Sequence, residues 1–97
     1  MKVISFEQFY RNNIIKMSAM FSFCSSLEEL NLSNFNTNNV KDISGMFLDC
    51  SSLKKLNLSN FKSEKVSEMN CLFFGCLSLT ELKCSDKLIN NQIKHII

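Results

Sequence analysis

Five cysteines and one histidine are the residues of this chain that could do the most chemistry, because thiolates and imidazoles bind metals and act as nucleophiles. Three of them, Cys24, Cys50 and Cys76, are spaced 26 residues apart. Zinc sites instead pair their ligands about two to four residues apart. Cys71 and Cys76 form the only close pair and lack a second pair to complete a site. We therefore expect no metal site.

The cysteines are better explained by packing than by chemistry. Cys24, Cys50 and Cys76 share one apolar column of the repeat described below, and Cys71 falls in a column of small residues. Cys84 takes the position that leucine occupies in the two preceding copies. We predict that all five are small buried hydrophobic residues. The alternative is a disulfide between stacked neighbours, because adjacent strands about 4.8 Å apart bring Cα atoms within disulfide range.

His95 is the only histidine, and no nucleophile motif accompanies it. The chain has two glycines and contains neither a G-x-S-x-G elbow nor a glycine-rich phosphate loop. We predict a surface or cap histidine, no enzyme activity and no cofactor.

The cysteine spacing is the period of the whole chain. Residues 17–42 and 43–68 are identical at 14 of 26 positions without a gap, which indicates a stack of one supersecondary unit. We predict a single repeat domain over residues 1–97. It divides into a divergent N-terminal half repeat or cap (1–16), two repeats (17–42 and 43–68), a partial repeat (69–86) and a C-terminal cap helix (87–97).

Two periodicities alternate within each repeat. Leu30 and Leu32 point one way and Asn31 the other, as in a short strand. A polar stretch follows, in which Thr37 or Ser63 could cap a helix. Apolar residues then recur every three or four positions, which is typical of one helical face; they are Val40, Ile43, Met46, Phe47 and Cys50, then Val66, Met69, Leu72, Phe73 and Cys76. We therefore predict strand, turn and helix in each unit, with parallel neighbouring strands. Ile89, Ile93, Ile96 and Ile97 have the spacing of a closing helix.

The outward positions of the predicted strands are the candidate partner-binding residues. They form three columns: Glu29, Lys55 and Glu81; Asn31, Asn57 and Lys83; and Ser33, Ser59 and Ser85. Their structural role would be to fix register and keep the sheet soluble, since opposite charges alternate in the first column. Their functional role would be to form a hydrophilic recognition surface, although it lacks the Trp, Tyr and Arg that binding hot spots favour.

Charge and hydropathy exclude several classes of protein. The net charge is +2, with acids and bases mixed along the chain, so no nucleic-acid-binding stripe is indicated. Apolar runs are a few residues long, against the roughly 20 that cross a bilayer, so we expect no membrane insertion. Glu7 and Arg11 interrupt the start before an apolar core could form, so we expect no signal peptide in this chain.

Two segments of the repeat carry a family resemblance: Met17-Ser18-Ala19-Met20-Phe21-Ser22-Phe23-Cys24-Ser25-Ser26-Leu27 and Leu30-Asn31-Leu32-Ser33-Asn34-Phe35. They resemble the BspA-like leucine-rich repeats of bacterial and protist surface proteins. The resemblance implies an α/β leucine-rich repeat solenoid of about three repeats plus divergent caps, with a parallel sheet on the concave side and short helices on the convex side. Phe35 and Phe61 replace the usual asparagine, so the buried asparagine ladder is expected to shift, with Asn34, Asn60 and Asp86 as candidates.

The function that this resemblance implies is adhesion at the cell surface, with a host or matrix protein as the kind of partner. We therefore expect a non-enzymatic protein-interaction or adhesion module, as a monomer or as a segment of a longer array. The alternative is an intracellular scaffold, or a structural fragment of a longer array with no activity of its own.

Overall fold

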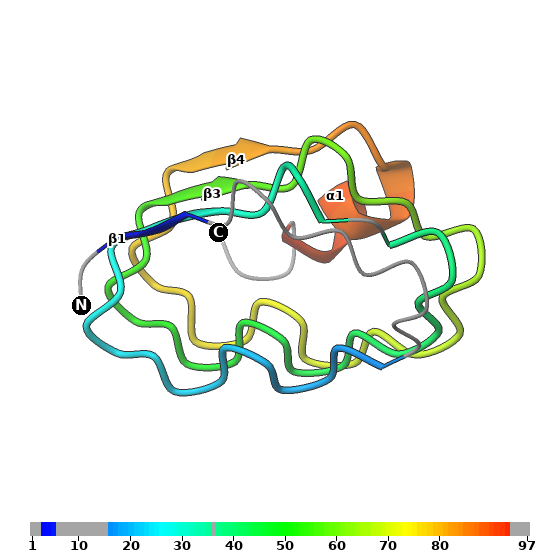
Figure 1. Ribbon diagram of the computed structural model, residues 1–97. Helices are drawn as coiled ribbons and strands as arrows, with labels where there is room; N and C mark the ends of the chain where they lie inside the picture. The colour runs from blue at the N-terminus through cyan, green and yellow to red at the C-terminus, as the bar shows by residue number, and fades with distance from the viewer. Residues whose placement is uncertain (1–2, 6–15, 36, 94–97) are drawn as a thin grey trace.

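Within the residues that the structure describes, the chain forms a small α/β structure with one parallel sheet and one helix (Figure 1). The computed structural model describes residues 3–5, 16–35 and 37–93. Its strands are β1 (Val3–Ser5), β2 (Glu29–Asn31), β3 (Lys55–Asn57) and β4 (Glu81–Lys83), and its helix is α1 (Lys87–Ile93). The sheet order is β1-β2-β3-β4. Sequential strands are thus neighbours, and the parallel pairing predicted from the repeat is confirmed.

The register of the sheet follows the repeat residue by residue. Leu30 of β2 pairs with Leu56 of β3, and Leu56 pairs with Leu82 of β4. Leu30 and Leu56 are buried, whereas the residues on either side of them are half-buried or exposed. This alternation is the period-two pattern of a strand with one buried face. A shift of one residue would expose the leucines, so the hydrophobic pattern fixes the register.

The predicted helices of the repeats are wrong. Residues 17–24, 43–50 and 69–76, here called the turn segments, form successive turns, and residues 16–35 and 37–86 contain no helix. In Figure 1 the turn segments run as wavy traces along the side opposite the sheet. An α-helix needs each N–H to bond the carbonyl four residues earlier. Here Ile43, Gly45, Phe47 and Asp49 donate instead to Glu68, Asn70, Leu72 and Phe74 in the next unit.

Positive φ angles account for this difference. Gly45 and Asp49 have φ of 61° and 56°, and the equivalent residues of the other units are also left-handed. A left-handed residue every four positions cannot belong to a right-handed helix. Between these residues, bonds such as Leu48 N–H to Gly45 O (3.1 Å) and Cys50 N–H to Phe47 O (3.2 Å) close single turns.

The apolar residues of the turn segments still form the core. Phe47 is fully buried, and its ring stacks between those of Phe21 and Phe73, at centroid distances of 6.0 and 5.7 Å. Each unit therefore has two inward-facing sides: leucines from the strand, and aromatic, sulfur-containing and aliphatic residues from the turn segment. These two sets of side chains pack against each other and fill the centre of the stack.

The asparagine ladder is not where it was expected. Asn34 and Asn60 are exposed, whereas Thr37 and Ser63, which were expected to cap helices, are buried. Thr37 Oγ1 accepts the N–H of Lys62 at 2.9 Å. Thr37 therefore joins two successive units by accepting a backbone N–H of the next unit.

Asp86 connects the segment that contains Ser63 to α1. Its carboxylate accepts the N–H of Ile89 at 3.1 Å and both the N–H and the hydroxyl of Ser63, at 2.7 and 2.9 Å. Burial opposes ionisation of Asp86, but these hydrogen bonds outweigh it and hold the pKa of the carboxyl below its usual value. The first bond is that of a helix N-cap. Ile89 of α1 is buried against the core; residues 94–97, which include His95, Ile96 and Ile97, lie outside the described part.

Candidate partner-binding face

The sequence-predicted residues lie on the outer side of the sheet. The strand face, as we call it, consists of Glu29, Asn31, Ser33, Lys55, Asn57, Ser59, Glu81, Lys83 and Ser85, all of them half-buried or exposed. The register pairs Glu29 with Lys55 and Lys55 with Glu81. It also pairs Asn31 with Asn57 and Asn57 with Lys83. Each of the three serines lies two residues after the end of a strand. The fold therefore places every predicted residue on the strand face.

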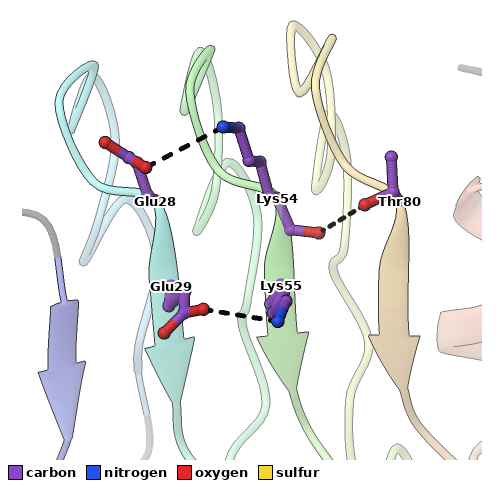
Figure 2. A network of polar contacts seen from close by, with 5 residues as sticks. All are labelled: Glu28, Glu29, Lys54, Lys55 and Thr80. Carbon is purple, nitrogen blue, oxygen red and sulfur yellow. Dashed lines mark hydrogen bonds and ion pairs between the residues drawn. The ribbon is translucent and has the colours of Figure 1, made fainter.

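Charge on the strand face is partly neutralised within the array. Lys55 Nζ lies 3.6 Å from Glu29 Oε1 (Figure 2). The strand register places Glu81 on the other side of Lys55. A second pair joins Lys54 Nζ to Glu28 Oε1 at 3.9 Å. The four side chains are 36% to 59% exposed, so each pair contributes roughly 1 kcal/mol or less to the free energy of unfolding.

The Glu28–Lys54 pair was missed by the sequence reasoning. Strict alternation would place these residues on the inward side, but each lies just before its strand. Here the N–H groups of Lys54 and Lys55 both donate to Glu28 O, and those of Thr80 and Glu81 both donate to Lys54 O. Each carbonyl is therefore shared by two successive N–H groups just before the strand, and both side chains reach solvent. The sequence did contain a signal for this pair: at position 28 as at position 29, an acid is followed by a lysine 26 residues later.

The asparagines of the strand face have a local role. Asn31 Oδ1 accepts the N–H of Ser33 at 2.9 Å, and Asn57 Oδ1 accepts the N–H of Ser59 at 3.0 Å. These bonds form Asx turns that end β2 and β3. Lys83 takes this position in β4, where Asn90 of α1 instead donates to Cys84 O at 2.6 Å. The side-chain oxygens of both asparagines are therefore already engaged by the backbone.

All five cysteines are free thiols. Cys50 and Cys76 are buried, and each donates to a carbonyl of the preceding unit: Cys50 to Phe21 O at 3.1 Å and Cys76 to Phe47 O at 3.0 Å. Burial raises the pKa of Cys50 to about 12 and that of Cys76 to about 11. Thiols in this state are poor nucleophiles and poor metal ligands, because both reactions need the thiolate.

The prediction of burial is wrong for Cys71, and only partly right for two other cysteines. Cys71 is exposed, and Cys24 and Cys84 are half-buried. The column of Cys71, shared with Ala19 and Gly45, contains small residues because the backbone is left-handed there, with φ near 60° at all three. The small size reflects backbone conformation and not confinement in the core.

In 3–5, 16–35 and 37–93, no three His, Cys, Asp or Glu side chains come together as a group that could hold a metal ion. Over the same ranges, no helix has both the length and the apolar character needed to cross a bilayer.

A family model described as "Mycoplasma protein of unknown function, DUF285" matches residues 2–93. The chain belongs to the DUF285 family. No curated protein and no solved structure matches it significantly.

The match spans β1 to α1, so the DUF285 unit includes all of the elements of the fold described above. The family match and the parallel sheet of the structure both fit a repeat protein. The family description assigns no activity, so function has to be argued from the surfaces of the molecule.

Proposed function

We propose that this DUF285 protein is a non-enzymatic protein-interaction or adhesion module, built as a BspA-like leucine-rich repeat solenoid. It binds a protein partner through the strand face. The resemblance of the 26-residue unit to BspA-like repeats suggests a place at the cell surface and a host or matrix protein as the partner.

One observation carries this proposal: two columns of polar residues are presented in register on adjacent strands, and a third column, of serines, follows the strands. The backbones of the two strand columns are fixed by the parallel ladder, so a partner meets their side chains in fixed rows. Repeat proteins usually bind through such a face of equivalent positions. The alternating charges of Glu29, Lys55 and Glu81 would select a partner by charge complementarity more than by apolar anchoring.

The second candidate function is structural, as an intracellular scaffold or as part of a longer array without an activity of its own. The contacts that favour it are the Glu29–Lys55 pair and the Asx turns of Asn31 and Asn57, which use the strand-face side chains within the chain itself. Under this alternative the face maintains register and solubility only.

Binding of purified protein to immobilised extracellular-matrix proteins tests the two candidates. We compare the wild type with Lys55→Glu on the strand face and with Lys41→Glu, an exposed residue away from it. Lys55→Glu places an acid between Glu29 and Glu81, so binding should weaken or shift to a different partner, while Lys41→Glu should bind as the wild type does. Circular dichroism checks that each variant is folded.

Two results would contradict adhesion through the strand face. Wild type that captures no matrix protein above background supports the structural alternative. Loss of binding in Lys41→Glu with retention in Lys55→Glu would move the site to another surface.

A further inference from the structure

Within the sheet that the structure describes, β4 has β3 on one side and no strand on the other (Figure 1). Glu81 N–H donates to Lys54 O. Lys83 O accepts the N–H of Leu58, so the peptide groups of both β4 residues face β3. Because successive peptide groups of a strand point to opposite sides, those of Leu82 face the open edge. An edge of this kind can pair with a further strand.

The edge of β4 lacks contacts that the inner strands make. Leu56 is 2% exposed, whereas its register partner Leu82 is half-buried. Lys54 O accepts the N–H groups of both Thr80 and Glu81 in the following unit. Thr80 O is the equivalent carbonyl beside β4, and no N–H of the described residues donates to it. The ladder therefore stops at β4 with one apolar side chain partly uncovered and with backbone groups available for pairing.

The helix α1 limits the length of this open edge. Asn90 of α1 donates to Cys84 O at 2.6 Å, so the carbonyl that follows β4 is already bonded. The available edge therefore covers residues 80–83. That length suits a short extended segment.

The charges of β4 are available to a partner, in contrast to those of β2 and β3. Lys55 pairs with Glu29 within the chain. Glu81 and Lys83 are both exposed, and neither makes an ion pair with another described residue. Their side chains lie two residues apart and therefore on the same face of β4. A strand beside β4 would meet an acid at one position and a base two residues later.

We infer that the open edge of β4 binds an extended segment of a partner protein, parallel to β4, with the pattern basic, apolar, acidic. The inference rests on the proposed function, because it places the partner at the edge of the strand face. A basic residue beside Glu81 continues the alternation of Glu29, Lys55 and Glu81 across the sheet. An apolar residue covers Leu82, and an acidic residue lies beside Lys83. The main-chain bonds of such an added strand supply affinity, and the side chains supply specificity.

Charge complementarity favours a separate partner over a second copy of this chain. The strand at the other edge of the described sheet, β1, is Val3-Ile4-Ser5 and has no charge to offer Glu81 or Lys83. The sequence contains no triad in which an apolar residue separates a preceding Lys or Arg from a following Asp or Glu. No segment of a second copy therefore matches the edge in the parallel direction.

NMR titration of the isotope-labelled protein with synthetic peptides tests the inference. The probe peptide has Lys-Val-Glu at its centre. One control peptide has Glu-Val-Lys instead, and the other carries an N-methyl group on the glutamate nitrogen, whose N–H would donate to Leu82 O. With the probe the amide signal of Leu82 should shift, whereas that of Leu30, two strands away, should stay in place. Each control peptide should bind about 10-fold more weakly than the probe.

A charge exchange on the protein gives the reciprocal test. Glu81→Lys combined with Lys83→Glu should reverse the preference, so that Glu-Val-Lys binds about 10-fold better than Lys-Val-Glu. Lys41→Glu, an exposed residue away from the strand face, is the matched control and should keep the wild-type preference. Circular dichroism checks that each variant is folded. Three results would overturn the inference: no shift of Leu82, equal binding of probe and control peptides by the wild type, or an unchanged preference after the exchange.

Capture of matrix proteins by the same variants separates this inference from the proposed function. If the wild type captures no matrix protein but shows the expected peptide preferences, adhesion fails and the edge site stands. If capture depends on Lys55 but not on the exchanged charges of Glu81 and Lys83, the partner binds elsewhere on the strand face. The edge inference then fails, while the proposed function stands.

Discussion

The sheet side of each unit, which contains the strand, and its turn side, which contains the turn segment, both hydrogen-bond to the next unit, but they do so with different backbone conformations. On both sides, alternate residues bond the next unit, as in Leu32 N–H to Asn57 O on one and Phe21 N–H to Met46 O on the other. The sheet side is extended. The turn side is coiled, and all six positive-φ residues of the described chain lie there. A left-handed conformation costs a residue other than glycine about 1 to 2 kcal/mol.

That cost must be offset by packing. Phe21, Phe47 and Phe73 form a continuous stack on the turn side, whereas the outward residues of the sheet side contact mainly solvent and each other. The turn side should therefore tolerate few substitutions, in either the core or the backbone. The sheet side should tolerate many at its outward positions.

Phe47→Ala should have the largest effect. The ring is fully buried between two others, so truncation should lower the free energy of unfolding by about 3 to 5 kcal/mol. For a domain of this size that is a large share of the stability. Urea denaturation followed by circular dichroism measures the change. Leu88→Ala on the exposed side of α1 is the control and should change it by less than about 0.5 kcal/mol. Equal effects would show that the phenylalanine stack does not carry the core.

Replacing each of the two glycines by alanine should distinguish the cost of backbone strain from the cost of steric crowding. Gly75 has φ of 82°, and a Cβ there would lie 3.0 Å from Asp49 Cα and closer still to its carboxylate. Gly75→Ala should thus cost about 2 to 4 kcal/mol. Gly45 has φ of 61°, and the nearest atom to its Cβ would be Leu48 Cβ at 3.8 Å. Gly45→Ala should cost about 1 kcal/mol, since Ala19 already holds that column.

Thermal unfolding of both variants, with Asp49→Gly/Gly75→Ala as a rescue, measures these costs. The rescue removes the carboxylate but leaves the backbone contact, so it should recover only part of the loss. If Gly45→Ala proved the more damaging of the two, the left-handed conformation and not the Asp49 contact would dominate the turn side.

The sheet side could be predicted from the sequence, because a period of two has one structural meaning. Alternation at Leu30 and Leu32, repeated 26 residues later, gave the strands, their direction and their register. The period also placed the outward columns correctly. It could not show that Asn31 and Asn57 bond the backbone, since an outward asparagine in solvent and one in an Asx turn have the same spacing.

The turn side could not be predicted in the same way, because apolar residues at intervals of three and four suit both a helix and a series of four-residue turns. Only the left-handed residues distinguish them, and their identities vary along the columns: Phe23, Asp49 and Gly75 share one conformation. Gly45 and Gly75 were the available signal, since glycine is disfavoured within a helix. The same conformation explains why Cys71 is exposed.

The buried thiols of the turn side should make the free energy of unfolding fall as the pH becomes alkaline. Burial raises the pKa of Cys50 to about 12 and that of Cys76 to about 11, above the ordinary value of 9.0. Below pH 9 both states hold these protons and stability is full. As the pH rises above 9 the unfolded chain loses them first, so the free energy of unfolding should fall until the pH passes the native pKa values. Cys50→Ala should flatten this slope when denaturation midpoints are compared between pH 8 and 11. An unchanged slope would indicate that these thiols ionise normally in the native state.

The smallest effect should come from the sheet side. Lys55→Glu removes the pair with Glu29 and places three carboxylates on neighbouring strands, with Glu81 as the third. The lysine and glutamate side chains are 55% and 44% exposed, so solvent screens the repulsion and the loss of stability should be about 1 kcal/mol. Lys54→Glu is the matched control: it faces only one acid, Glu28, with Thr80 on its other side, and should cost less. Added salt should reduce both losses, and more so for Lys55→Glu. A loss for Lys55→Glu as large as that for Gly75→Ala would mean that the outward columns hold the stack together, and the strand face would then have no freedom to vary for binding.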